Sequence, residues 1–205
     1  MQLYSSPPSP FGRKVKVAAH ILGLNDQIEI VQTDTFAAND PIRQINPLGK
    51  IPALVTAAAT FYDSRVIMEY LDHLAGGDKI MPLAADARFA CMVRMAMIDG
   101  MLDAALAIVY EARLRPEDMR SDSVVAHQRD KIIRVLQSLE SGAAAQGGYT
   151  NGTMPDAAEI GLACALEYMD FRNVIAWEQY APSLKVWLAD INAKVPALVA
   201  THPAT

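Results

Sequence analysis

The sequence predicts a small α/β domain followed by an all-helical domain. Strand-like segments occur only within the first 75 residues, where they alternate with helical patterns. The stretch GGDKIMPL, which comes next, has the composition of a linker. Beyond it, apolar residues recur at helical spacing in long runs rich in Ala, Met and Leu. We therefore expect one domain at residues 1–76, a linker at 77–84 and a second domain at 85–205.

The first domain shows a β-α-β pattern that leads into a β-β-α pattern. MQLY is a short apolar strand, and the helical run after it is followed by Gly23, a residue suited to ending a helix. QIEIVQ has the alternation of a strand. IPALVT and TFYDS are two further strands joined by an alanine-rich turn, and a helical pattern follows them over residues 66–74.

The second domain shows helical patterns at residues 86–115, 123–145, 154–169 and 181–194. Thr153 and Asp156 form a Thr-x-x-Asp box before an apolar helix, and such a box exchanges hydrogen bonds between side chains and backbone. We expect Asp156 to be buried, paired and structural, although an acidic residue there resembles a catalytic base.

Composition narrows the class of protein. Of the 205 residues, 52% are hydrophobic and 20% charged, so a packed core is expected. A net charge of −5 and a pI near 5.3 argue against a nucleic-acid-binding face. No apolar run approaches the roughly 18 residues of a membrane span. The N-terminus also lacks the basic-then-apolar pattern of a secretory signal, so we expect a cytoplasmic protein with no membrane contact.

Two cysteines, Cys91 and Cys164, lie far apart in the sequence. Neither belongs to a CxxC or a Cys/His cluster, so no zinc or iron–sulfur site is expected. Both lie in apolar, helix-like surroundings. We expect them to be buried free thiols, as is usual in a reducing compartment.

The segment INPLGKIPALV places Pro52 at the start of an apolar strand. Because proline cannot donate a hydrogen bond to a sheet, it belongs at a strand start or edge. A cis bond before Pro52 would leave the N–H and C=O of Ile51 pointing outward, where a peptide-like ligand could pair with them. An ordinary trans proline is the alternative.

The segment FYDSRVIMEYL places Asp63 and Ser64 just before a helical pattern. Either residue could cap that helix. No Glu or Gln follows three positions later, so no capping box closes the helix start. Free N–H groups there favour a carboxylate, and Asp63 could take an ammonium group. Together the two residues would suit the head group of an amino acid.

The segment SSPPSPFGRKVK contains a third candidate site. Ser9 followed by Pro10 fits the N-cap and first positions of a helix. In the same geometry a hydroxyl could donate to a thiolate, whose formation the helix dipole also favours. The residues alone leave both roles open.

These three segments together resemble the cytosolic glutathione transferase superfamily, over essentially the whole chain. The resemblance implies a thioredoxin-like first domain and an all-helical second domain. It rests mainly on NPLGKIPAL followed shortly by the pair DS.

The resemblance also implies a set of contacts to glutathione. Pro52 would be cis, Ile51 would pair its backbone with the cysteinyl part, and Lys50 would approach the glycine carboxylate. Asp63 and Ser64 would hold the γ-glutamyl group, with Asp63 in place of the family's usual Glu.

The stretch SPPSPFGRKV resembles the catalytic loop of the serine-type classes. Ser9 matches their thiol-activating serine, and Phe11 lies in the SPF motif of the glutathione site. Because no cysteine lies at this position or near it, a mixed disulfide with the protein is disfavoured. Tyr4, Ser5 and Ser6 are weaker candidates for the catalytic role.

The long helix of the second domain carries Asp99 and Asp103 one turn apart. They could form a solvated face. Alternatively, as the resemblance implies, one of them could reach glutathione bound to the other subunit of a homodimer. Met97, Met101, Tyr110 and Arg113 could border a second substrate, although methionines on a helix are more often core residues.

The function implied is that of a glutathione transferase, which conjugates the glutathione thiolate to electrophilic, mostly apolar small molecules. Glutathione would be the co-substrate, and no metal or nucleic acid would take part. Peroxide reduction or dehalogenation at the same thiolate are related possibilities. The alternative is a glutathione-binding or protein-interaction module with little catalysis.

Overall fold

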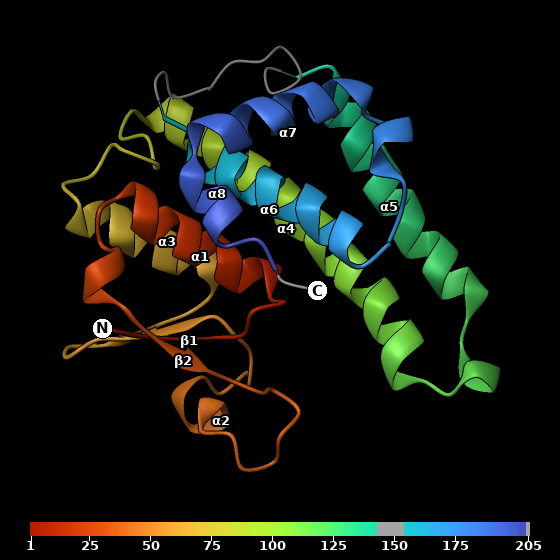
Figure 1. Ribbon diagram of the computed structural model, residues 1–205, viewed down its shortest axis with the longest axis horizontal. Coiled ribbons are helices and arrows are strands. Elements are labelled where there is room, and N and C mark those ends of the chain that lie inside the picture. The colour runs from red at the N-terminus through yellow and green to blue at the C-terminus, as the bar shows by residue number, and fades with distance from the viewer. Residues whose placement is uncertain (143–153, 204–205) are drawn as a thin grey trace.

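The computed structural model describes residues 1–142 and 154–203 (Figure 1). The first domain follows the order expected from the sequence: β1 (Gln2–Ser5), α1 (Pro10–Ile21), β2 (Glu29–Gln32), α2 (Ile42–Ile45), β3 (Ala53–Val55), β4 (Thr60–Phe61) and α3 (Ser64–Leu74). The short helix α2 was not expected. The sheet order is β2-β1-β3-β4, in which β1 and β2 are parallel and the other two pairs are antiparallel.

The second domain is helical, as predicted. It contains α4 (Ala85–Leu114), α5 (Asp122–Glu140), α6 (Ala157–Phe171), α7 (Pro182–Lys194) and α8 (Pro196–Ala200). The expected bounds of α5 and α6 were wrong by a few residues, and α8 was missed because Pro196 looked like a stop. In the part of the chain that the structure describes, no helix is both long and apolar enough to cross a membrane.

Helix α6 lies at the centre of the molecule and holds the two domains together. Every residue from Ala157 to Met169 is buried, as expected for a helix that is apolar on all sides. It packs against α1 of the first domain and α4 of the second. Figure 1 shows α1 and α3 on the side of the sheet that faces the helical domain, with α2 on the opposite side.

The start of α6 confirms that Asp156 is buried and paired. Thr153 lies outside the described residues. Asp156 is itself the N-cap: its Oδ1 accepts the N–H of Glu159 at 2.9 Å, and Glu159 Oε2 accepts the N–H of Asp156 at 2.9 Å. Asp156 also forms an ion pair with Arg94 of α4. Asp156 and Glu159 thus form a reciprocal capping box, and sequence reasoning missed this role of Glu159.

Replacing Asp156 with alanine is expected to lower the free energy of unfolding by about 2–3 kcal/mol. The change removes a helix cap and a buried partner of a charged group. Urea denaturation measures the loss. The matched control is Ser121→Ala, which removes the exposed N-cap of α5 and should cost about 1 kcal/mol or less. Equal losses in the two variants would mean that the ion pair with Arg94 adds nothing.

Two buried basic residues of α1 join the first domain to the second. Arg13 forms an ion pair with Glu167 of α6 and donates to the carbonyl of Leu198 at 2.7 Å. Lys14 forms an ion pair with Asp99 of α4. The side chains of Arg13 and Lys14 are each only 2% exposed. These ion pairs fix the first turns of α1, and with them the loop that precedes the helix.

Candidate active site

The register of the sheet brings the three candidate segments to one edge. Strand β1 runs toward this edge and ends at Ser5, just before the loop that contains Ser9. Strand β3 starts there, directly after Pro52, because Tyr4 pairs with Ala53. Strand β4 returns to the same edge, because Leu54 pairs with Phe61. Asp63 follows at once, so all three segments border a common region at the start of α1 and α3.

Ser9 is the N-cap of α1, as the capping interpretation predicted. Its Oγ accepts the N–H of Gly12 at 3.1 Å, and Pro10 takes the first helical position. This bond uses a lone pair of the hydroxyl and leaves its proton free to donate to a neighbouring acceptor. The cap and a thiol-binding role are therefore compatible in one side chain.

The other serines of the loop differ from Ser9. Ser5 is fully buried, and its Oγ has no hydrogen-bond partner among the described residues. That oxygen lies 2.1 Å from the place where a Cβ on Gly12 would lie, so only glycine fits at position 12. Ser5 is too buried to contact a ligand. The loop is held by a bond from the N–H of Ser9 to the carbonyl of Ser6 at 3.2 Å.

The bond between Ile51 and Pro52 is cis, which confirms the expectation from the family resemblance. The N–H and C=O of Ile51 make no hydrogen bond to any other described residue. Asn46, which sequence reasoning missed, shapes this turn: its Nδ2 donates to the carbonyl of Lys50 at 2.8 Å. The Asn-Pro dipeptide was the available signal, because such pairs initiate turns. The side chain of Lys50 is exposed.

Asp63 caps α3 and Ser64 is its buried first residue. Asp63 Oδ1 accepts the N–H of Arg65 at 2.9 Å, and its other oxygen pairs with the Arg65 guanidinium at 2.9 Å. Partial burial acts to raise the pKa of Asp63, but the bonds from Arg65 and the charge of Lys14 lower it below its usual value. Asp63 is therefore held as a carboxylate, the form that attracts an ammonium group.

Arg65 links this carboxylate to the helical domain. Its Nε lies 3.6 Å from Oδ2 of Asp99, which also pairs with Lys14. The solvated face expected for Asp99 is therefore wrong, since the residue is only 9% exposed. Burial raises the pKa of Asp99, although Lys14 and Arg65 oppose the rise. Sequence reasoning missed Arg65 and Lys14 because nothing local shows that α1, α3 and α4 meet here.

The remaining candidates divide between core and surface. Met101 is buried in the core and Met97 is half-buried. Asp103 and Arg113 are exposed, and Tyr110 is partly so. Phe11 is half-buried, and Lys14 Nζ lies 5.0 Å from the centre of its ring.

The cysteines are free and buried, as predicted. Burial raises the pKa of both Cys91 and Cys164 to about 11, so both stay protonated near neutral pH. Among the described residues, no cluster of His, Cys, Asp and Glu could hold a metal ion. A reactive thiolate at this site would have to come from a ligand.

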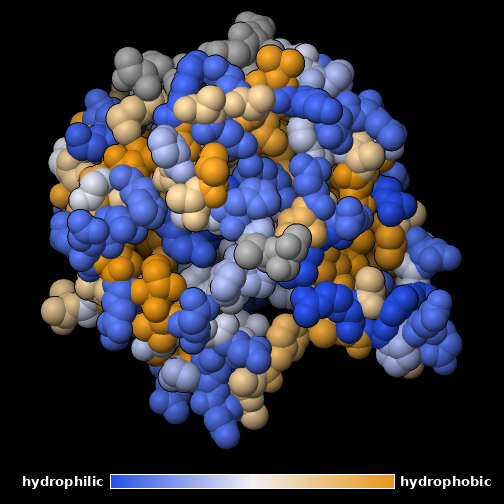
Figure 2. Space-filling view, viewed as in Figure 1, coloured by the Kyte–Doolittle hydropathy of each residue, from blue (hydrophilic) through white to orange (hydrophobic). Residues whose placement is uncertain are grey.

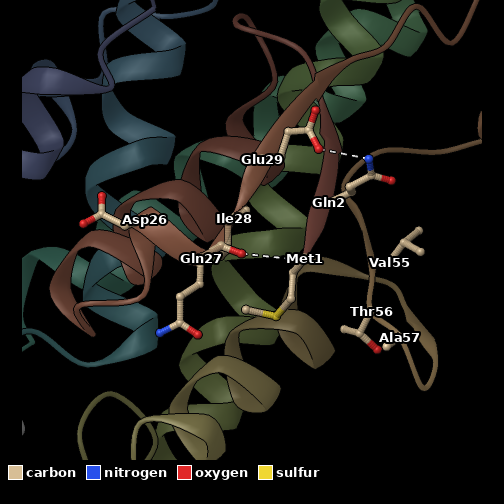
Figure 3. A pocket seen from close by; sticks show the side chains of 9 residues that line it. All are labelled: Met1, Gln2, Asp26, Gln27, Ile28, Glu29, Val55, Thr56 and Ala57. Carbon is tan, nitrogen blue, oxygen red and sulfur yellow. Dashed lines mark hydrogen bonds between the residues drawn. The ribbon is translucent and has the colours of Figure 1, made fainter.

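Two hollows lie near the ends of the first strand. One of about 500 Å³ lies at the start of β1 and β2, away from Ser9; Figure 3 shows its lining residues Met1, Gln2, Asp26, Gln27, Ile28, Glu29, Val55, Thr56 and Ala57. The other is small, borders Ser9 and is lined by Pro7, Pro8, Ser9, Pro10, Arg13, Cys164, Tyr168 and Pro203. Its lining residues come from the loop before α1, from the first turns of α1, from α6 and from the C-terminal segment.

Comparison with known proteins agrees with this architecture. The family model for "Glutathione S-transferase, N-terminal domain" matches residues 3–79, and that for "Glutathione S-transferase, C-terminal domain" matches residues 122–190. The chain therefore belongs to the glutathione transferase family. The expected thioredoxin-like and all-helical domains are confirmed.

Relatives are similar to this chain over different shares of its length. An uncharacterized GST-like protein of Escherichia coli K12, YibF, is 34% identical, with 85% of this chain and 84% of that protein covered. A glutathione transferase family member from Pseudomonas fluorescens Pf-5, solved with bound glutathione, has a TM-score of 0.90 and is 36% identical, with 100% and 99% covered. A stringent starvation protein A homolog of Coxiella burnetii is 28% identical and matches only 54% of this chain and 52% of its own length.

Proposed function

We propose that this protein is a glutathione transferase of the serine type, which joins the thiolate of glutathione to electrophilic carbon atoms. The observation that carries the proposal is the meeting of Ser9, the cis bond before Pro52 and the Asp63–Ser64 pair at one edge of the sheet. Membership of the family and relatives with bound glutathione support it.

Each part of glutathione has a partner in this arrangement. Asp63 and Ser64 receive the γ-glutamyl head group, with Asp63 taking its ammonium. The unpaired N–H and C=O of Ile51 pair with the cysteinyl backbone. Lys50 and the ring of Phe11 complete the site, Lys50 by approaching the glycine carboxylate. The sulfur then lies at the start of α1, beside the Ser9 hydroxyl.

Ser9 donates a hydrogen bond to the thiolate, which lowers the pKa of the thiol. A shift from about 8.5 to about 6.5 corresponds to about 2.7 kcal/mol. One hydrogen bond to a charged group supplies about 1.5–3 kcal/mol, and the helix dipole adds to it. The thiol proton leaves to solvent. The sulfur then forms a bond to the electrophilic carbon, and the leaving group departs with the bonding electron pair.

The decisive experiment is a pH titration of glutathione bound to the protein, followed by the ultraviolet absorbance of the thiolate. We expect an apparent thiol pKa about two units below the free value of about 8.5. An unshifted pKa in a complex that does form would contradict the transferase proposal.

A second candidate function is a glutathione-binding or protein-interaction module with little catalysis. Matches to stringent starvation protein A homologues, which span about half of the chain, favour it. Such a module would be retained on immobilised glutathione and yet conjugate no member of a broad electrophile panel. Conjugation of even one member would favour the transferase. Peroxide reduction and dehalogenation would use the same thiolate and differ only in the electrophile.

We further propose that the protein acts as a homodimer in the cytoplasm. Exposed apolar side chains of α3 and of the first turns of α4 gather around the Glu69–Arg88 ion pair: Val66, Phe89, Met92 and Val93. Association of two copies would cover them, and Asp103 would then be the candidate to contact glutathione of the partner. Sedimentation equilibrium should give twice the chain mass of 22.3 kDa, and a mass of one chain would contradict the dimer.

A further inference from the structure

Two arginines and two tyrosines of the helical domain lie at the C-terminal ends of α4 and α6. Tyr110 and Arg113 are neighbours on one face of α4, and Tyr168 and Arg172 are neighbours on one face of α6. Helices α4 and α6 pack against each other. Burial raises the pKa of the Tyr168 hydroxyl, and the positive charges of Arg172 and Arg113 oppose the rise. The four side chains are therefore close enough to act on one another.

This cluster is continuous with the candidate active site. Tyr168 is only 5% exposed and lines the small hollow that Ser9 also lines. We call these four residues the arginine–tyrosine wall: Tyr110, Arg113, Tyr168 and Arg172. Through Tyr168, the wall begins next to the proposed thiol-binding position.

An aromatic pair borders the wall at its outer end. Phe36, in the loop after β2, makes an edge-to-face contact with Tyr110, with ring centres 5.9 Å apart. Figure 1 shows this orange loop extending toward the far end of α4, and Figure 2 shows the surface hollowed between the sheet domain and that end. Phe36 is 59% exposed and Tyr110 is 38% exposed, so both rings retain free surface for a planar group.

The positive charge of the wall is not balanced by the protein. Neither Arg113 nor Arg172 forms an ion pair with any residue that the structure describes. The nearby acids already have partners: Glu167 pairs with Arg13, and Glu111 pairs with Arg115. The Nε of Arg172 is buried and has no hydrogen-bond partner within the described ranges, while its guanidinium lies 4.3 Å from the centre of the Phe171 ring.

We propose that the second substrate is an aromatic electrophile that carries a carboxylate. Arg113 and Arg172 bind the carboxylate, and Phe36 and Tyr110 contact the aromatic ring. A guanidinium is the group best suited to a planar carboxylate, because its N–H groups match the two oxygens. This inference rests on the proposed function, since it assigns the second substrate of the same site. It narrows the mostly apolar electrophile expected from the sequence to one that also carries a carboxylate.

The reaction balances without a further reactant. Glutathione and a carboxylate-bearing benzylic halide give the thioether, a halide ion and a proton. The carbon–sulfur bond forms as the carbon–halogen bond breaks, and the halide leaves with the bonding electrons. The carboxylate is unchanged throughout and serves only to orient the ring.

Binding of two stable thioethers tests the inference without requiring turnover. The probes are S-(4-carboxybenzyl)glutathione and its neutral counterpart S-(4-carbamoylbenzyl)glutathione, measured by calorimetry, with glutathione alone as the reference. We expect the carboxylate to bind about tenfold more tightly than the amide, because its hydrogen bonds to arginine are charge-assisted. In the Arg113→Gln/Arg172→Gln double variant this preference should fall to within about twofold.

The control variant is Arg129→Gln, which removes one positive charge from an exposed position of α5. It should leave the preference unchanged. Arg113→Gln alone changes only an exposed residue and should lower the preference while the protein remains folded. Equal binding of the two probes, or a preference that survives in the double variant, would overturn the inference.

The reference ligand separates this inference from the proposed function. Glutathione that binds with an unshifted thiol pKa contradicts catalysis, yet the two probes still report on the wall. If glutathione binds and neither thioether does, the wall is not a substrate site and the inference fails by itself. If glutathione does not bind at all, both proposals fail.

Discussion

Replacing Ser9 with alanine is expected to return the thiol pKa of bound glutathione toward its free value of about 8.5. If the normal complex titrates near 6.5, the thiolate fraction at pH 6.5 falls from one half to about one hundredth. The conjugation rate should then fall about fiftyfold at that pH, because only the thiolate attacks. The loss should shrink above pH 9, where the thiol ionises without help. Initial rates across pH measure both effects.

Two further variants separate thiol activation from helix capping, since Ser9 also accepts the N–H of Gly12. Ser9→Thr keeps both the cap and the hydroxyl, so it should retain much of the activity. Ser9→Asp keeps the cap but places a carboxylate beside the sulfur, so it should be at least as inactive as Ser9→Ala. Activity in Ser9→Ala that is equal to that of the unaltered protein would show that Ser9 is only a cap.

Replacing Glu167 with alanine is expected to lower the free energy of unfolding by about 3–5 kcal/mol, the usual cost of leaving a buried charge without its partner. Arg13 would lose its carboxylate partner, and its side chain is only 2% exposed. Glu167 also accepts a hydrogen bond from Asn192 Nδ2 at 2.7 Å, and this bond would be lost as well. Chemical denaturation, with the transition slope checked for two-state behaviour, measures the change.

The matched control for Glu167→Ala is Asp190→Asn, which breaks an exposed pair with Lys194 on α7. Exposed pairs of this kind contribute about 0.3–0.5 kcal/mol. The control should therefore have almost the same free energy of unfolding as the unaltered protein. A loss below about 1 kcal/mol in Glu167→Ala would mean that water reaches Arg13 and replaces the carboxylate.

Local patterns in the sequence predicted most of the fold. Each of these elements is predicted by a pattern that spans only a few residues. Examples are the strands before and after Gly23, the proline at the start of β3 and the long apolar helices. The cap at Ser9 was predicted for the same reason. The cis bond at Pro52 was left open by the residues and was expected only from the family resemblance. The capping role of Glu159 was missed although its signal is also local, because Asp-x-x-Glu overlaps Thr-x-x-Asp there.

Residues that act between elements could not be predicted in this way. Arg13 and Lys14 look like ordinary solvated charges of an exposed helix turn, and Asp99 looks like one of a surface pair. Their burial depends on how α1 meets α4 and α6, which a pattern within one helix does not contain. Tyr110 and Arg113 of the arginine–tyrosine wall were expected to border the second substrate. Tyr168 and Arg172 were missed for the same reason, because they lie far from them in the sequence.

The ion pairs of α1 have a consequence for how this protein can be divided. A fragment ending at residue 76 would keep the sheet and the residues proposed to contact glutathione, but it would lose Glu167 and Asp99 together. Arg13 and Lys14 would then face water beside an apolar surface that α6 normally covers. Such a fragment should associate or unfold rather than bind ligand as a monomer. We therefore expect the two domains to fold as one unit and not as separable modules.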